Sequence, residues 1–291
     1  MTTQQLPQGS ALSLSSSLPH YARVLSIAGS DSGGGAGIQA DLKTFSALGC
    51  YGMTAITAIT AQNTQGVTAI HGIPAQMLQA QIDAVVQDIG VDAIKIGMLH
   101  APDIVHVVAD AIRRYGITQV VLDPVMVATS GDKLIQDETV QVLVRELFPL
   151  ATVVTPNLDE AGWLIGRPIA ATADMEPAAQ ALLDMGAQHV LLKGGHLPGD
   201  WVMDLLAGPD GLRKELGSQR IHTHNGHGTG CTLSSAIAAH MALGFELEEA
   251  VASARTYIVG AIASGAQVYT GYGQGPLNHG FAPMPQVIFR A

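Results

Sequence analysis

The sequence predicts an α/β protein built on a mainly parallel central sheet with helices on both faces and a few antiparallel strands at one edge. From residue 24 to about residue 195, short apolar segments alternate with longer segments of helical apolar spacing, the pattern of successive βαβ units. Hydrophobic residues make up 47% of the 291 residues and charged residues only 13%, so both faces of such a sheet can be buried.

The first predicted unit opens with the apolar run 24–29, which ends in glycine and indicates a buried strand. A Gly- and Ser-rich loop follows, and helical spacing then covers 38–48 until Gly49 ends it. Residues 53–61 are rich in Thr and Ile, whose branched side chains favour a second strand, and Gln62–Asn63 ends that strand.

The same alternation continues through four further helix–strand pairs. Each helix is predicted from apolar residues at helical spacing, and each strand from a short apolar run. In chain order, the helices cover 75–89, 102–115, 138–147 and 175–185, and the strands that follow them cover 93–98, 120–124, 152–157 and 190–195.

After Gly195 the pattern changes to shorter strands with turns, 201–206 and 211–223, which we expect as antiparallel additions at one sheet edge. Two helices, 230–243 and 247–266, complete the chain. No break in composition and no internal repeat interrupts this order, so residues 22–291 are predicted to form one domain.

Residues 1–21 are rich in Ser, Gln and Pro and lack the basic and long apolar regions of a signal peptide, so we expect a disordered or loosely attached tail. The chain has a net charge of −10 and no basic stripe that could bind the phosphates of a nucleic acid. No apolar run has the length of a membrane span. Two cysteines, Cys50 and Cys231, form no disulfide framework, which favours a cytoplasmic protein.

One glycine-rich turn, 225–233, opens directly into an alanine-rich helix. Unpaired N–H groups at a helix N-terminus attract anions, phosphates especially, and their field would favour the thiolate of Cys231. The alternative interpretation is an ordinary linker before a helix, with Cys231 as a small core residue.

Polar residues recur where predicted strands end, and in such sheets ligands bind beyond the carboxyl ends of the strands. They are Asp31, Gln62, Asp123, Asn157 and Lys193, and the apolar Met98 follows a strand in the same way. A phosphate cradle, a lysine and carboxylates are the parts of phosphoryl transfer. No P-loop motif is present. Gly35–Ala40 fits a dinucleotide-binding turn, but no acidic residue ends the second strand, which disfavours a dehydrogenase.

Seven segments together resemble the motifs of hydroxymethylpyrimidine/phosphomethylpyrimidine kinases, in the same order and over residues 23 to the C-terminus. They are 27–44, 61–64, 95–99, 122–126, 155–160, 193–196 and 227–231. The resemblance implies a ribokinase-like fold and a kinase that phosphorylates 4-amino-5-hydroxymethyl-2-methylpyrimidine and then its monophosphate for thiamine biosynthesis, with ATP and Mg²⁺. A monovalent cation is a further candidate cofactor.

By this resemblance, Asp41 and Gln62 would hold the amino group and ring nitrogens of the pyrimidine, with Met98 against the ring. A carboxylate can accept hydrogen bonds from an amidine-like edge, and an amide side chain can both donate and accept hydrogen bonds. The plain alternatives are a solvated helix carboxylate for Asp41 and a strand-end cap for Gln62.

The resemblance also implies the phosphate end of the site. Lys193 would neutralise the transferring phosphoryl group and contact the nucleotide; its plain alternative is a surface lysine. The anion hole would comprise Gly228, Thr229, Gly230 and Cys231. Asn157 with the carboxylates of Asp123 and Glu160 would hold Mg²⁺ and the ATP phosphates, largely through water. Asn157 and Glu160 also fit a helix N-terminal capping pair.

Cys231 stands where sugar kinases of the superfamily carry an aspartate base, and a thiol can replace that base only if its pKa is lowered. Two other functions stay open: a pyridoxal kinase of the same superfamily, and a non-catalytic sensor of the pyrimidine or nucleotide. The resemblance alone implies a homodimer. The segment Pro276–His279 also resembles the family, but its residues indicate no chemistry.

Overall fold

The computed structural model describes residues 18–126 and 135–290, and its centre is an eight-stranded sheet in the order β11-β10-β9-β8-β7-β6-β2-β3. The strands are β2 (Arg23–Ala28), β3 (Tyr51–Ile56), β6 (Ala93–Ile96), β7 (Val120–Leu122), β8 (Val153–Val154), β9 (Val190–Leu192), β10 (Trp201–Ala207) and β11 (Arg213–Gln219). All pairings from β3 to β9 are parallel, whereas β10 and β11 are antiparallel additions at the edge. The predicted fold class is confirmed.

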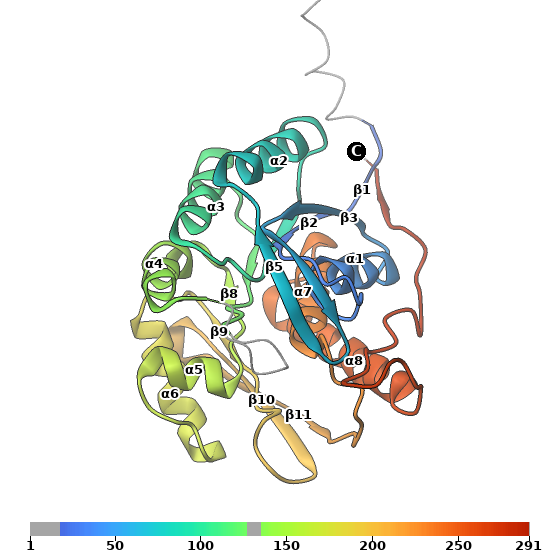
Figure 1. Ribbon diagram of the computed structural model, residues 1–291. Helices are drawn as coiled ribbons and strands as arrows, with labels where there is room; N and C mark the ends of the chain where they lie inside the picture. The colour runs from blue at the N-terminus through green and yellow to red at the C-terminus, as the bar shows by residue number, and fades with distance from the viewer. Residues whose placement is uncertain (1–17, 127–134, 291) are drawn as a thin grey trace, which may run out of the picture.

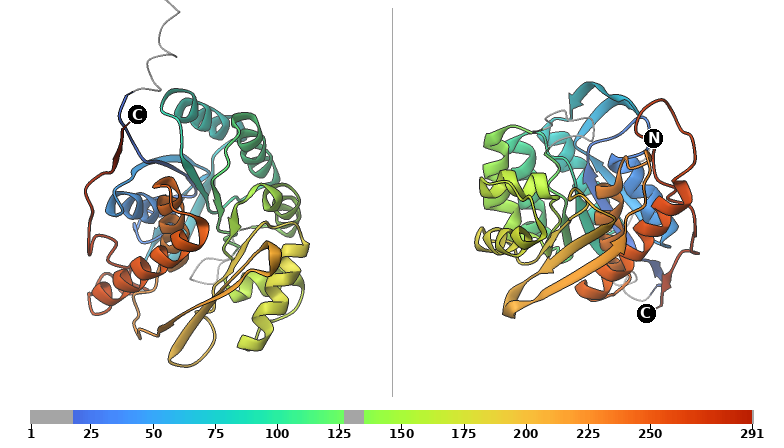
Figure 2. Two further views of the ribbon diagram at one scale, coloured as in Figure 1. Left: turned by 180° about the vertical axis from the view of Figure 1, so that it is seen from behind. Right: turned by 90° about the horizontal axis from the view of Figure 1, so that it is seen from below.

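Helices cover both faces of this sheet (Figures 1 and 2). One face carries α1 (Gly37–Ala47), α7 (Thr229–Ala242) and α8 (Leu247–Gly265). The other carries α2 (Ala75–Asp88), α3 (Pro102–Tyr115), α4 (Asp137–Leu147), α5 (Leu158–Ile165) and α6 (Met175–Asp184). Successive strand residues alternate between the two cores: Val24 packs under α1 and α7, and Leu25 packs on the opposite face.

One predicted strand, 53–61, is wrong in its extent, because the chain leaves the main sheet at Thr57. The Thr57 side chain is buried and donates a hydrogen bond to the Met98 carbonyl at 2.8 Å, which turns the backbone away. Beyond it, β4 (Ala58–Asn63) pairs antiparallel with β5 (Gly66–Gly72) as a separate two-stranded sheet. No local pattern predicts β5, because both of its faces are largely exposed and its residues do not alternate in polarity.

The short helix α5 was not predicted as an element, although its capping pair was noted. Among the described residues, 3₁₀ turns also form at Phe148–Leu150, Thr172–Asp174 and Pro209–Gly211.

The predicted tail lies mostly outside the described residues. Its last two residues form β1 (His20–Tyr21), which pairs antiparallel with β12 (Ile288–Phe289) near the other end of the chain. Within the described ranges, none of the helices combines the length and the apolar character that crossing a bilayer demands.

Candidate active site

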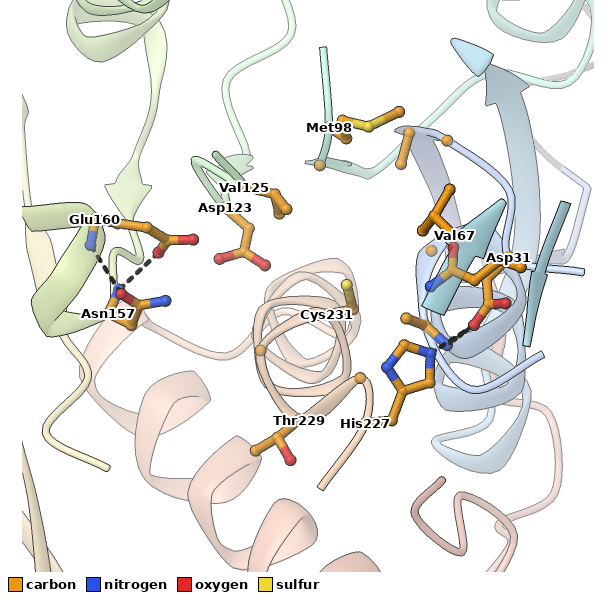
Figure 3. A pocket seen from close by; sticks show the side chains of 18 of the residues that line it. Asp31, Val67, Met98, Asp123, Val125, Asn157, Glu160, His227, Thr229 and Cys231 are labelled. Atoms are coloured by element: carbon orange, nitrogen blue, oxygen red, sulfur yellow. Dashed lines mark hydrogen bonds and ion pairs between the residues drawn. The ribbon is translucent and has the colours of Figure 1, made fainter. Parts of the chain in front are cut away.

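A cavity of about 520 Å³ opens beyond the carboxyl ends of the parallel strands β2, β6, β7 and β9. Side chains from these strand ends, from β5 and from the first turn of α7 point into the same space (Figure 3). This is the edge of a parallel sheet where ligands bind. Ten of the eleven residues predicted for the site line this cavity: Gln62, Met98, Asp123, Asn157, Glu160, Lys193, Gly228, Thr229, Gly230 and Cys231.

The glycine-rich turn before α7 forms one wall of the cavity. Gly228 caps the helix with φ 84°, in the left-handed region, and a Cβ there would lie 1.9 Å from the Gly35 carbonyl oxygen. Only glycine fits this position, for both reasons. The first helical hydrogen bond runs from the Thr232 N–H to the Gly228 carbonyl at 2.9 Å. The N–H groups of the first turn therefore face the cavity with the positive end of the helix dipole.

Lys193 reaches this first turn from the end of β9. Its Nζ would lie 3.2 Å from a Cβ at Gly230, and it donates to Asp123 Oδ1 at 2.9 Å. Thr155 and Ser234 also donate to the Asp123 carboxylate. Burial alone would raise the pKa of Asp123, but the lysine charges outweigh burial and hold that pKa below its usual value.

Asn157 and Glu160 form a capping box at the start of α5. The Glu160 N–H donates to Asn157 Oδ1 at 2.9 Å, and the Asn157 N–H donates to Glu160 Oε2 at 2.8 Å. The capping alternative is thus confirmed, and both side chains nevertheless border the cavity. Burial, opposed by the charge of Lys193 and reinforced by that of Asp123, raises the pKa of Glu160 to about 7. The Glu160 carboxyl group therefore titrates near neutral pH.

Across the cavity from Glu160, apolar side chains lie beside the Gln62 amide and the Asp31–His227 pair (Figure 3). Met98 follows β6, and the site of a Cβ on Gly29 lies only 2.6 Å from its Cε, so the glycine makes room for the methionine. Gln62 on β4 is held through its backbone by the Ser32 hydroxyl, and its Oε1 accepts from Thr60. Val67 and Val125 add apolar surface, as a flat heteroaromatic ring requires (Figure 3).

Asp41 is not where the sequence predicts it, and the prediction that it contacts the pyrimidine is not supported by its position. Its side chain is 0% exposed and does not border the cavity. Lys95 donates to both of its oxygens, at 2.9 and 3.0 Å, and the hydroxyls of Ser26 and Ser235 donate at 2.6 Å each. A carboxylate with this many partners is a buried structural anion.

The thiol of Cys231 lines the cavity, but its environment differs from the expected one. Burial raises its pKa to about 11, and the Asp41 and Asp123 charges raise it too, although Lys95 and a backbone hydrogen bond from Gly37 lower it. Burial therefore opposes the thiolate that the helix field is expected to favour. At neutral pH the group is a thiol.

Sequence reasoning assigned no role to Lys95 or His227, although both border the cavity. Lys95, on β6, is fully buried and lines the cavity above Asp41. A lysine inside the apolar run Ala93–Ile96 was the signal that could have identified it, since buried lysines need a partner. Asp31 and His227 line the same cavity from two glycine-rich loops.

A second cavity of about 360 Å³ adjoins the first and shares six residues with it: Asn157, Lys193, His196, Gly226, Thr229 and Gly230. Its walls combine aliphatic side chains of α7 and α8 with polar groups of the β10–β11 region. The aliphatic ones are Leu233, Ile258, Val259 and Ile262, and the polar ones are Asp204, Ser218 and Arg220; α8 also contributes the guanidinium of Arg255. The arrangement suits a ligand with a flat apolar part and a charged end that reaches the shared residues.

Known proteins share this sequence and architecture. The sequence profile of the family described as phosphomethylpyrimidine kinase matches residues 31–278. The chain is 54% identical over 256 residues to the hydroxymethylpyrimidine/phosphomethylpyrimidine kinase of Rhizobium meliloti (strain 1021), covering 88% of this chain and 96% of the relative. Two solved structures are similar. Phosphomethylpyrimidine kinase of Clostridium difficile 630 has a TM-score of 0.73 at 44% identity, covering 82% of this chain and 99% of that one. An ADP complex of Bacillus subtilis pyridoxal kinase has a TM-score of 0.82 at 39% identity, covering 89% and 98%.

Proposed function

The chain belongs to the phosphomethylpyrimidine kinase family, and we propose how its two adjoining cavities divide the substrates of the reaction. Its activity is that of a hydroxymethylpyrimidine and phosphomethylpyrimidine kinase, a phosphotransferase of thiamine biosynthesis with a ribokinase-like fold. The residues that carry this activity, the metal and the assembly state are the subject of the proposal.

The observation that carries the proposal is the set of residues common to both cavities. Lys193, Thr229 and Gly230 border both, and they are a cation and the amides of a helix N-terminus. We assign the nucleoside of ATP to the second cavity and the pyrimidine to the Gln62–Met98 end of the first. The γ-phosphate then lies between them, at the one place that both ligands reach.

Asp123 and Glu160 fit a role in binding Mg²⁺. Both carboxyl groups are buried at the cavity, and burial, with a smaller contribution from the charge of Asp123, raises the pKa of Glu160 to about 7. Among the described residues, no three metal-ligating side chains gather closely enough to enclose an ion. Mg²⁺ retains several waters and is commonly bound by one or two carboxylates with the substrate phosphates, which matches this donor set. When bound, the ion would neutralise phosphate charge.

The chain's own groups then account for the transfer. The hydroxymethyl oxygen of the pyrimidine forms a bond to the γ-phosphorus, the bond from that phosphorus to the β-phosphate oxygen breaks, and ADP leaves. Lys193 and the amides of the anion hole stabilise the charge on the transferring group. The hydroxyl proton passes to Sγ of Cys231, which must first be a thiolate. Phosphorylation of the monophosphate follows the same path from a phosphate oxygen.

One observation keeps pyridoxal phosphorylation as a second candidate: the similarity to the Bacillus subtilis pyridoxal kinase at 39% identity. Coupled ADP-release assays with the hydroxymethylpyrimidine, its monophosphate and pyridoxal decide between them. We expect kcat/KM to favour the pyrimidines, and a preference for pyridoxal would overturn the assignment. The sensor alternative predicts tight pyrimidine binding with no ADP release at saturating MgATP.

We further propose that residues 22–291 form one domain and that the protein is a homodimer in the cytoplasm. The exposed side chains of Ile59 and Ile70 on the separate β4–β5 sheet support a partner surface, because a lone two-stranded sheet is marginal in water. Both cysteines are free thiols, which supports a reducing compartment. A mass measurement by light scattering at micromolar concentration tests the dimer. A monovalent cation site stays a prediction.

A further inference from the structure

The segment Gly275–His279, after α8, lies against the loop that forms the anion hole. The His227 N–H donates to the Gly275 carbonyl at 3.0 Å, and the Gly275 N–H donates to the His224 carbonyl at 3.2 Å. His227 and Pro276 form a β-bridge. A Cβ at Gly275 would lie 2.0 Å from Asn225 Oδ1, so the Asn225 side chain packs directly against the Gly275 backbone. The C-terminal segment is thus a wall of the anion-hole loop.

His279, the last residue of this segment, reaches into the first turn of α7. Its Nε2 lies 3.0 Å from the Thr232 hydroxyl, and both side chains are buried. Its carbonyl accepts a hydrogen bond from the Tyr257 hydroxyl at 2.6 Å, and its ring also hydrogen-bonds the Leu277 backbone. The imidazole is therefore held by Thr232 and Leu277, and Tyr257 holds the backbone of the same residue.

The protonation state of His279 sets the direction of its bond to Thr232. Burial, together with the nearby charge of Lys43, lowers the pKa of His279 to about 4, so the ring is neutral near pH 7. A neutral imidazole has one N–H, and that N–H serves the Leu277 carbonyl. The other ring nitrogen then accepts a hydrogen bond from the Thr232 hydroxyl.

We propose that His279 is a positioning residue for the anion hole, acting through Thr232 to hold the first turn of α7 in register. The inference rests on the proposed function, in which that turn binds the transferring phosphate. Thr232 follows Cys231 directly, and its own N–H closes the first hydrogen bond of the helix, to Gly228. Fixing the Thr232 side chain therefore fixes the direction of the amides one and two residues before it.

The sequence of the turn explains why outside support is needed. Gly228, Gly230 and Thr229 have low intrinsic helix propensity, and no side chain caps the helix. A first turn held only by backbone bonds would fray. Misplacement of a catalytic group by about 1 Å can cost up to roughly a hundredfold in rate, so a modest loss of register is measurable as kcat.

The test compares variants that remove the hydrogen bond with variants that keep it. His279→Leu removes the acceptor and Thr232→Val removes the donor, whereas His279→Gln keeps an acceptor at similar reach and Thr232→Ser keeps the hydroxyl. We expect kcat to fall roughly 10- to 100-fold in the first two and by less than about threefold in the second two. The Kd for the pyrimidine should not change, because Gln62 and Met98 are untouched.

Val108→Ala is the control for simple destabilisation, since Val108 is fully buried on α3 on the other face of the sheet. It should lower Tm without lowering kcat. The double variant Thr232→Val/His279→Leu should be no slower than the worse single variant, because both changes break one bond.

Normal kcat in a folded His279→Leu protein, or additive losses in the double variant, overturns the proposal. If His279→Leu does not fold, the comparison of Thr232→Val with Thr232→Ser decides alone: equal kcat overturns the proposal, and selective loss in the valine variant supports it. If the wild-type protein releases no ADP with the pyrimidine, the proposed function is contradicted instead. The role of His279 is tested only when the wild type is active, because the variants are compared with its kcat.

Discussion

Asp31 Oδ2 lies 2.8 Å from His227 Nε2, although the two residues are 196 positions apart in the chain. The same carboxylate accepts hydrogen bonds from the N–H groups of Gly33, Gly35 and Ala36. His227 immediately precedes Gly228, whose left-handed backbone contacts the Gly35 carbonyl. One buried carboxylate therefore ties the first glycine-rich loop to the anion hole, and both loops should lose their shape together if it is removed.

His227→Leu tests this connection. We expect kcat to fall roughly 10- to 100-fold because the anion hole shifts, and the free energy of unfolding to fall by about 1–3 kcal/mol because buried Asp31 loses a partner. Steady-state kinetics and urea unfolding measure the two effects. His106→Leu is the control: His106 contacts Glu146 at 2.9 Å on the surface, where loss of the pair should change neither quantity appreciably. Unchanged kcat in His227→Leu would contradict the coupling of the two loops.

Asp41→Asn distinguishes a structural anion from a substrate ligand. The change leaves the buried charge of Lys95 without its counter-ion, so we expect unfolding to become easier by about 3–5 kcal/mol. The pyrimidine Kd, measured by calorimetry at a temperature where the variant is folded, should stay within about threefold of wild type.

The double variant Asp41→Leu/Lys95→Met removes both charges and should recover much of the lost stability. A buried ion pair contributes little more to the free energy of unfolding than two apolar side chains in the same place. A variant of Asp41 with normal Tm and a Kd weakened more than about tenfold would show instead that Asp41 binds the ring.

Much of the fold could be predicted because the signals are local. The helix at 102–115 combines Pro at its start, a glycine after its end and one apolar face, and α3 has those bounds. The meeting of Asp123 and Lys193 was predictable too. Parallel strands bring their carboxyl ends to one edge, so polar residues that follow different strands gather there.

The features of the fold and the site that could not be predicted depend on contacts between residues far apart in the sequence. Thr57 ends β3 because its hydroxyl finds the Met98 carbonyl, 41 residues away, and no local pattern contains that fact. Asp41 was assigned to the pyrimidine on its motif alone, whereas its partner Lys95 is 54 residues away. Whether a carboxylate faces a cavity or lies beneath it is decided by such tertiary contacts. Cys231 illustrates the same limit, since the local helix field favours its thiolate and burial outweighs it.

Glu160 predicts a pH dependence of Mg²⁺ binding. Its pKa of about 7 means that protons and the cation compete for the carboxylate. The apparent Kd for Mg²⁺ should therefore fall as pH rises from about 6 to about 8 and be constant above that. Titration of ADP release with Mg²⁺ at several pH values measures it. Glu160→Gln should bind Mg²⁺ more weakly and without this pH dependence; an unchanged profile in that variant would assign the dependence to another group.

The same group affects stability with a definite sign. Its folded pKa of about 7 exceeds the ordinary value of 4.5, so the native protein holds a proton that the unfolded chain releases. This stabilisation is complete below about pH 4.5 and is lost as pH rises through about 7. In metal-free buffer near pH 8, Glu160→Gln should therefore have a higher Tm than wild type, and near pH 5 the difference should shrink. A lower Tm of the variant near pH 8 contradicts the sign.

Lys193→Met removes the cation shared by the two cavities. Loss of one group that stabilises transition-state charge costs roughly 10²- to 10³-fold in kcat, and we expect a loss in that range. The pKa of Asp123 should also rise, because the lysine charge now holds it down. Kinetics with MgATP at saturation measures the first effect. Lys214→Met, which breaks an exposed pair with Glu248, is the matched control and should leave kcat unchanged. A Lys193 variant with near-normal kcat would remove the lysine from the transfer step.

Cys231 as the base makes two linked predictions, because its pKa of about 11 leaves only a small thiolate fraction at neutral pH. That fraction increases about tenfold per pH unit, so kcat of the wild type should still be rising between about pH 8 and 9, above the titration of Glu160. Cys231→Ala should lower kcat by roughly 10²- to 10⁴-fold, the usual cost of losing a general base, and abolish this rise while the pyrimidine Kd hardly changes. Cys231→Asp carries a base that is ionised near pH 7, so it should retain partial activity and show no such rise. If the alanine variant keeps near-normal kcat with the same alkaline profile as wild type, the thiol takes no part in proton transfer, and Lys193 with the amides of the anion hole supplies the catalysis.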